Sequence, residues 1–224
     1  MGRPGHRPIA TLIATGLLGG SFNPAHGGHR AISVATISAL QLDELWWLVS
    51  PGNPLKPREG MAPLAARLAS ARQQSRNSRI RATAIEAELG TRYTVDTLRA
   101  LVRRYPSRRF IWIMGADNLA QLHQWRDWRA IARLMPIAVV ARPGYDGRAR
   151  TVVVMGWLRR YVRPADRRKQ WTTWSTPSLV FLRFSPDPRS ASRLRLSNPD
   201  WHTDLPARSS RDAVTHRLLS KDYH

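Results

Sequence analysis

The sequence of 224 residues contains no cysteine. This absence excludes disulfide bonds, thiol chemistry and every cysteine-based metal site. No apolar run reaches the roughly 18 residues that a membrane-spanning helix needs, so no membrane association is expected. Residues 1–7 are basic and precede an apolar run, but that run is broken by threonines and lacks a convincing cleavage site. We therefore expect a first strand here rather than a signal peptide, and a cytoplasmic protein.

Acidic residues are also scarce, since 15 Asp and Glu face 36 Lys and Arg, a formal net charge of +21. One interpretation of such a charge is a basic surface that binds nucleic acid. The other is an arginine-rich protein that handles small polyanions. The arginines are spread along the chain rather than clustered in an arm, which favours the second interpretation and predicts no specific nucleic-acid partner.

The two common phosphate-loop fingerprints are missing as well, yet residues 17–30 carry another pattern of the same kind. An apolar run over 9–18 predicts a buried strand that stops at Gly19-Gly20. An Asn-Pro loop, two histidines three residues apart and a helix from about Gly28 follow. Glycines allow close approach of a polyanion, and a helix N-terminus presents unpaired N–H groups. This order of elements suits phosphate binding.

Two simpler explanations of the stretch remain to be weighed. The histidines could belong to a structural zinc site, but such a site needs two further ligands in a chain without cysteine. The glycines could form a plain strand-to-helix turn, which is their commoner use. A plain turn does not explain why histidines, Asn-Pro and glycines occur together.

The segment from Gly19 to His29 resembles the signature Gly-Gly-Ser/Thr-Phe-Asp/Asn-Pro-x-His-x-Gly-His of the adenylyl- and cytidylyltransferases that share a His-x-Gly-His motif. Together with apolar runs at 9–18, 44–49, 80–85, 109–115, 137–140 and 179–184, the resemblance implies an α/β fold. We expect a Rossmann-like, doubly wound, mostly parallel sheet of about five to six strands with helices on both faces. Residues 1–224 would form a single nucleotidyltransferase domain with a core over about 12–198, a short N-terminal extension and a polar, partly disordered tail after about 200.

A second informative stretch spans residues 91–98, Thr-Arg-Tyr-Thr-Val-Asp-Thr-Leu. Thr94 predicts a helix cap with Asp96 and Thr97 in the first turn, and a capped helix alone would account for the pattern. The stretch also resembles the Ser-Tyr-Thr-x-Asp-Thr-Leu motif of bacterial nicotinate-nucleotide adenylyltransferases. That resemblance implies that Tyr93 and Thr94 lie at a nicotinate mononucleotide pocket.

Three further segments match the same family residue by residue. Gly115, Asp117, Leu119 and Trp125 match Gly-x-Asp-x-Leu followed by a tryptophan, which implies a nucleotide contact for Asp117 and ring stacking for Trp125. Lys56, in a proline-rich loop after a strand, corresponds to a phosphate-binding position, although the usual neighbouring histidine is missing. Arg142 corresponds to a basic position near the adenosine.

Residues 190–195, Ser-Ala-Ser-Arg-Leu-Arg, resemble the family's second signature, Ser-Ser/Thr-Thr-x-Ile-Arg. The resemblance implies that Ser190, Ser192 and Arg195 hold the β- and γ-phosphates of ATP. Ala191 replaces a hydroxyl, which puts one phosphate contact in doubt. An N-capped helix would be the purely structural explanation.

The family resemblance implies transfer of AMP from ATP to nicotinate mononucleotide, giving deamido-NAD and pyrophosphate in NAD synthesis. Catalytic roles fall to His26, His29 and Arg195, and Mg²⁺ would arrive with ATP rather than in a protein metal site. The implied ATP-binding residues are Gly19, Gly20, Ser21, Phe22, His26, His29, Asp117, Arg142, Ser190, Ser192 and Arg195. The implied substrate-binding residues are Asn23, Lys56, Tyr93, Thr94, Asp117 and Trp125.

Alternatives from other classes stay open at this point. A sister adenylyltransferase acting on nicotinamide mononucleotide or phosphopantetheine would share the first signature. A basic RNA-binding module or an inactive homologue would bind no ATP productively. The preference for nicotinate over nicotinamide and the oligomeric state, a homo-oligomer included, leave no trace in the sequence.

Overall fold

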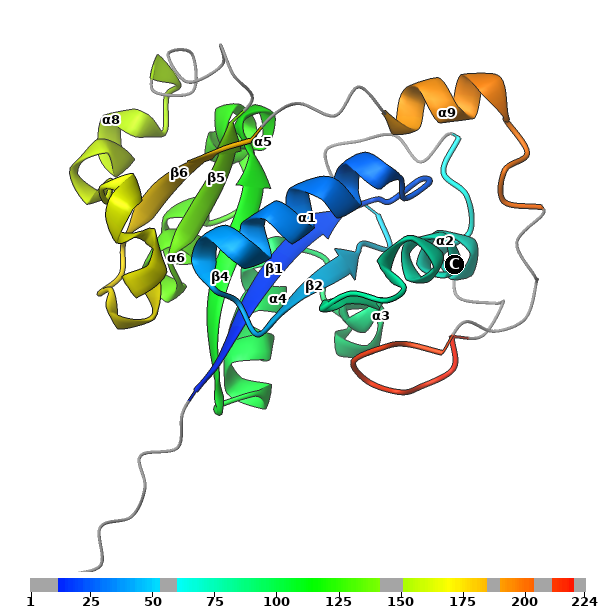
Figure 1. Ribbon diagram of the computed structural model, residues 1–224, viewed down its shortest axis with the longest axis horizontal. Coiled ribbons are helices and arrows are strands. Elements are labelled where there is room, and N and C mark those ends of the chain that lie inside the picture. Colours follow the sequence, from blue (N-terminus) through cyan, green and yellow to red (C-terminus); the bar gives the residue numbers. More distant parts are fainter. Residues whose placement is uncertain (1–11, 53–59, 142–150, 185–189, 204–210, 220–224) are drawn as a thin grey trace, which may run out of the picture.

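A computed structural model describes residues 12–52, 60–141, 151–184, 190–203 and 211–219. These residues form one sheet of six parallel strands in the order β3-β2-β1-β4-β5-β6, with helices on both faces (Figure 1). The strands are β1 (Ile13–Gly20), β2 (Glu44–Val49), β3 (Ile80–Thr83), β4 (Arg108–Gly115), β5 (Ile137–Ala141) and β6 (Leu179–Arg183). The predicted doubly wound α/β fold is therefore confirmed.

Two groups of helices cover the two faces of the sheet. One face packs against α1 (Gly27–Leu40), α2 (Leu64–Ser75) and the 3₁₀ helix η3 (Ala165–Thr173). The other face packs against α3 (Ile85–Leu89), α4 (Thr94–Arg104), α5 (Ala116–Gln121), η1 (Leu122–Gln124), α6 (Trp128–Leu134) and α8 (Met155–Leu158). The short 3₁₀ helix η2 (Arg159–Tyr161) follows α8, and α9 (Ala191–Ser197) lies beyond the carboxyl ends of the strands (Figure 1).

The strand order reverses between β1 and β4, because the chain moves outward from β1 to β3 and then returns to the other side of β1. In open parallel sheets, ligands bind at the carboxyl ends of the strands beside such a reversal. Here these ends are Gly20 of β1 and Gly115 of β4. The fold thus brings the first signature and the predicted Asp117 region to one place.

The end of the first strand differs from the prediction. β1 includes Gly19 and Gly20, which pair with Leu48 and Val49 of β2, whereas the prediction had the strand stop before them. Position 19 of the strand requires a glycine, because a Cβ on Gly19 would lie only 2.7 Å from the ring of Trp112. The third strand is shorter than expected, because the chain turns into α3 at Ile85.

The polar tail after about residue 200 includes a segment that the structure describes. Residues 211–219 form a closed turn with an antiparallel bridge between Arg211 and Leu218. This segment lies beside α3, where Figure 1 shows it in red. Among the helices that the structure describes, none is long and apolar enough to cross a bilayer.

Candidate active site

The two signature histidines build the start of α1 together. His26 is the N-cap, and its Nδ1 accepts a hydrogen bond from the backbone N–H of Gly28 at 3.1 Å. His29 Nδ1 accepts one from the backbone N–H of His26 at 3.2 Å, and the ring centroids are 3.9 Å apart. Because both Nδ1 atoms accept, each neutral ring carries its proton on Nε2. The pair can therefore donate two hydrogen bonds to an anion at the helix N-terminus.

The packing around His29 keeps it uncharged. Its ring lies 5.0 Å from that of Phe22 and 6.1 Å from that of Trp47, whose indole N–H donates to Ser33 Oγ at 2.8 Å. Burial, and secondly the neighbouring His26, lower the pKa of His29 to about 3. This imidazole therefore stays neutral throughout the physiological range and acts as a dipolar donor.

A buried arginine holds the loops of the site together. Arg67 of α2 is 1% exposed. Its guanidinium donates to Ser21 O at 2.8 Å, Ser50 O at 2.6 Å, Pro51 O at 3.3 Å and Ala62 O at 2.8 Å. Burial lowers the pKa of Arg67 to about 10, so the group stays charged. It ties the first signature to the loop after β2 and to the approach to α2.

A cavity of about 190 Å³ opens next to the signature glycines. Five of the predicted site residues line it, and a sixth, Thr94, joins them from the first turn of α4. The lining residues from the first prediction are Gly19, Gly20, Ser21, Tyr93, Thr94 and Trp125. The sheet, α4 and the segment after η1 therefore meet around one space that can receive a small ligand.

Aromatic rings and guanidinium groups face one another at this cavity. Trp125 lies edge-on to Trp112, with ring centroids 6.4 Å apart. The guanidinium carbon of Arg126 is 4.7 Å from the Tyr93 ring centroid, and that of Arg92 is 5.9 Å from it. Both arginines line the cavity. A flat, anionic ligand would find stacking surfaces and positive charge together.

The cavity also holds a carboxyl group that sequence reasoning missed. Glu86 of α3 lines it, and Thr97 Oγ1 donates to Glu86 Oε1 at 3.4 Å. Burial raises the pKa of Glu86 to about 7, against the opposing hydrogen bonds from Ser50 and Thr97. Thr97 also shares a 2.8 Å hydrogen bond with Thr91. A polar network thus underlies the wall that carries Tyr93.

The second signature reaches the first through one hydrogen bond. Ser190 caps α9 by accepting from the backbone N–H of Arg193 at 3.3 Å, which is the structural explanation weighed for this signature above. Arg195 Nη1 donates to Asn23 O at 2.7 Å, and its Nη2 donates to Ser192 Oγ at 3.4 Å. Residues 172 positions apart in sequence are therefore in direct contact. This hydrogen bond joins α9 to the loop that precedes the histidine pair.

The remaining predicted residues have varied positions. Asn23 is buried and its side chain bridges Gly60 O and Ala62 N at 2.8 and 3.2 Å. Asp117 lies in the first turn of α5 and is exposed, while its neighbour Asn118 lines the cavity. Lys56 and Arg142 fall outside the described residues.

The predicted cap of α4 is wrong. Thr94 is the first residue of that helix, and Tyr93 occupies the N-cap position without a side-chain cap hydrogen bond. Thr94 instead lines the cavity from the first turn of α4. A threonine ahead of an apolar helix face has the pattern of a cap, which is why the sequence misled the assignment.

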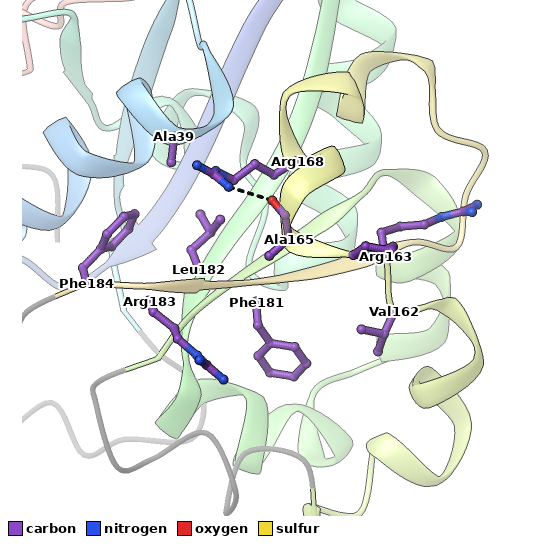
Figure 2. A pocket seen from close by; sticks show the side chains of 10 residues that line it. Ala39, Val162, Arg163, Ala165, Arg168, Phe181, Leu182, Arg183 and Phe184 are labelled. Carbon is purple, nitrogen blue, oxygen red and sulfur yellow. Dashed lines mark hydrogen bonds between the residues drawn. The ribbon is translucent and has the colours of Figure 1, made fainter.

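A larger cavity of about 590 Å³ lies elsewhere, at the edge strand β6. Figure 2 shows Leu182 and Phe184 on the side of β6 that faces Ala39 of α1 and η3, Phe181 on the other side of the strand, and Arg168 donating to Ala165 O. None of the predicted site residues lines it. Size alone therefore does not mark the candidate site, and the signature residues do.

Metal-binding clusters give no further guidance. Over the residues that the structure describes, no group of three or more His, Asp or Glu side chains is arranged to hold a metal ion. The site offers imidazole, hydroxyl, guanidinium and backbone N–H groups, which can donate hydrogen bonds to phosphate oxygens.

The comparisons with known proteins agree with this geometry. The cytidylyltransferase-like family model matches residues 17–195, so the chain belongs to that family. A probable nicotinate-nucleotide adenylyltransferase of Erythrobacter litoralis is 59% identical over 211 residues, which cover 94% of this chain and 96% of that protein. Another from Parvibaculum lavamentivorans is 49% identical over 183 residues, covering 82% and 91%. Within the family, the chain thus groups with the nicotinate-nucleotide adenylyltransferases.

Solved structures extend the likeness of the fold. The Plasmodium falciparum nicotinic acid mononucleotide adenylyltransferase complexed with NaAD matches with a TM-score of 0.57 and 16% identity, over 82% of both chains. At this identity the match shows the shared fold.

Proposed function

We propose that this chain transfers the adenylyl group of ATP to nicotinate mononucleotide and forms deamido-NAD and pyrophosphate. One observation carries the proposal: Gly19, Gly20 and Ser21 of the first signature, whose two histidines form the start of α1, line a cavity that aromatic rings and two arginines border. The curated relatives at 59% and 49% identity support the same activity. We further propose that residues 1–224 form a single domain and that the protein acts in the cytoplasm.

The reaction needs no proton transfer. A phosphate oxygen of nicotinate mononucleotide, ionised at neutral pH, attacks the α-phosphorus of ATP. A new phosphorus–oxygen bond forms, and the bond to the bridging oxygen of pyrophosphate breaks with its electron pair leaving on pyrophosphate. The protein therefore contributes positioning and stabilisation of charge rather than a general base.

The proposed roles follow the donors of the site. His26 and His29 donate their Nε2–H groups to ATP phosphates, with His29 nearest the α-phosphate. Ser190, Ser192 and Arg195 hold the β- and γ-phosphates and assist departure of pyrophosphate. The other ATP contacts are assigned to Gly19, Gly20, Ser21, Phe22, Asp117 and Arg142, and the other substrate contacts to Asn23, Lys56, Tyr93, Thr94 and Trp125.

Mg²⁺ belongs to this proposal as part of the ATP substrate. The donor set described above suits phosphate oxygens, so the ion would be carried on the phosphates with several of its waters. Its chemistry is to neutralise phosphate charge, while the side chains orient the two reactants.

The charge around the cavity favours the acid over the amide. Arg92 and Arg126 both line it, and both lie against the Tyr93 ring. A nicotinate carboxylate gains from two nearby guanidinium groups, whereas a neutral nicotinamide does not. Glu86 opposes this preference only in its ionised form, and burial raises its pKa to about 7.

The test is pyrophosphate release from ATP and Mg²⁺ with nicotinate mononucleotide, nicotinamide mononucleotide and phosphopantetheine in parallel. We expect rapid release with the first substrate alone, and loss of turnover by about 100-fold or more in His29→Ala, because a positioned donor to developing charge contributes at that scale. His123→Ala, an exposed histidine on η1, is the matched control. Release with a different substrate, or full turnover in His29→Ala, would refute the assignment.

A further inference from the structure

A segment near the C-terminus packs against the substrate side of the molecule. Residues 211–219 lie beyond the family model, which ends at residue 195. They fold into a closed turn in which Asp212 N donates to Arg217 O at 2.8 Å, and Ala213 N donates to Ala82 O of β3 at 3.2 Å. β3 is an edge strand, so the segment covers one edge of the sheet next to α3 (Figure 1).

Asp212 is the centre of this contact. It is only 4% exposed, and each of its carboxylate oxygens accepts two hydrogen bonds. Oδ1 accepts from the N–H groups of Val214 and Thr215 at 2.8 and 2.9 Å, which closes its own turn. Oδ2 accepts from Thr83 Oγ1 at 2.8 Å and from Ala84 N at 2.7 Å, at the junction of β3 and α3. One carboxylate thus joins two distant parts of the chain.

The junction needs such a partner because α3 is short. A helix of five residues has too few internal hydrogen bonds to be stable by itself. Its N-cap residue, Ala84, has no side chain that can satisfy the first N–H groups. Thr83 Oγ1 accepts from Ile85 N at 3.1 Å while donating to Asp212. The orientation of α3 therefore depends on a residue more than a hundred positions away.

The helix so held forms part of the cavity wall. Its second residue, Glu86, lines the cavity and accepts from Thr97 of α4. Glu86 O accepts from Thr91 N at 3.2 Å, which sets the course of the loop toward Tyr93. Glu88, two residues further along α3, pairs with Arg104 of α4 at 2.7 Å and with Arg217 of the C-terminal segment at 3.6 Å.

We propose that Asp212 is a positioning residue for the pyridine-nucleotide cavity: by fixing the β3–α3 junction it places Glu86 and the Tyr93 loop for substrate. This inference rests on the proposed function. The histidine pair at the start of α1 and the phosphate donors of α9 make no hydrogen bond with Asp212 in the described residues, so loss of Asp212 weakens the nicotinate side of the site and leaves the ATP side intact.

Steady-state kinetics of the full chain test the proposal. In Asp212→Ala we expect KM for nicotinate mononucleotide to rise about tenfold, while KM for ATP and kcat change less than about twofold. Asp212→Asn replaces one acceptor oxygen by a donor that faces N–H or O–H donors, so it should show the same selective rise. The matched control is Asp200→Ala, which removes an exposed carboxylate that, like Asp212, follows α9 in the sequence. Its kinetic constants should equal those of the wild type. Equal changes in both KM values, or none, would overturn the inference.

A second variant covers the case in which Asp212→Ala does not fold. Thr83→Val keeps the shape of the side chain and removes the hydroxyl that links Asp212 Oδ2 to Ile85 N. We expect a smaller, equally selective rise in KM for nicotinate mononucleotide. Combining it with Asp212→Asn should add little, because both changes break one network. Additive effects would refute the shared network.

Hydrogen exchange separates this inference from the proposed activity. The amides of Ala84 and Ile85 should exchange at least tenfold faster in Asp212→Asn than in the wild type, because their acceptor network is lost. If the wild type releases no pyrophosphate with nicotinate mononucleotide, the proposed function fails, and with it the assignment of Asp212 to that substrate. If the wild type is active and exchange at these amides is unchanged, the positioning role alone is refuted.

Discussion

Replacement of Arg67 by methionine should lower the free energy of unfolding by more than the replacement of an exposed arginine does. Methionine keeps a long unbranched side chain but removes the donors to four backbone carbonyls, at Ser21, Ser50, Pro51 and Ala62. Arg67 is 1% exposed, so the space it leaves does not fill readily with solvent.

The magnitude follows from those four carbonyls. An unsatisfied buried acceptor costs about 1–3 kcal/mol, and the low end gives about 4 kcal/mol in all. Ser50 and Pro51 are half-buried, so water reaches part of the gap and lowers the cost. Removing a buried charge returns some of its desolvation penalty, which the lowered pKa of about 10 reveals. We therefore expect the free energy of unfolding to fall by about 3 kcal/mol.

Urea unfolding followed by tryptophan fluorescence measures this loss. Arg76→Met is the control, because Arg76 is exposed at the end of the same helix and should change stability by less than about 0.5 kcal/mol. Turnover of folded Arg67→Met should fall as well, since the first signature loses its tie to the loop after β2. A loss of stability below about 1 kcal/mol, or equal losses in both variants, would refute the proposal that Arg67 holds the loops of the site together.

Three other predictions concern single residues. Folding lowers the pKa of His29 from 6.5 to about 3, so the free energy of unfolding should decline as pH falls below about 6.5, by about 2 kcal/mol at pH 5. In urea titrations, His29→Gln should remove that part of the pH dependence. An unchanged pH dependence in this variant would contradict a buried, neutral His29 ring. Gly19→Ala places a Cβ 2.7 Å from the Trp112 ring and should cost about 1–3 kcal/mol in thermal unfolding, whereas Gly156→Ala, with nothing within 4 Å, should be neutral. Trp125→Ala should raise KM for nicotinate mononucleotide about tenfold, and Trp128→Ala, whose ring packs on Trp157, should not; equal effects would exclude stacking by Trp125.

The strands and the first signature were predictable because their patterns are local. Buried parallel strands are continuous apolar runs, and β2 was predicted with the bounds that the structure shows. The alternation of strands and helices then restricted the topology to an open parallel sheet. The capping role of Ser190 was predictable for the same reason, since the helix it caps starts at the next residue.

Long-range partnerships were beyond the reach of such patterns. In the sequence, Arg67 cannot be distinguished from other arginines on amphipathic helices. Its four carbonyl partners become its neighbours only in the folded chain. Glu86 and Arg126 line the cavity from segments 40 residues apart. Asp212 lies in a polar tail whose composition indicates disorder, and its partners lie 128 and 129 positions away. Only the tertiary structure shows these contacts.

The neutral imidazole of His29 at the start of α1 bears on how pyrophosphate leaves the site. A cluster of permanent cations would hold pyrophosphate by net charge, and that hold would persist after the bond to the α-phosphorus has broken. Directed Nε2–H dipoles instead depend on alignment, which weakens as the leaving group moves. Such a donor stabilises the leaving group only while the two are aligned, so it hinders the departure of pyrophosphate less than a further cation would. The equilibrium between reactants and products in solution is the same with or without the protein.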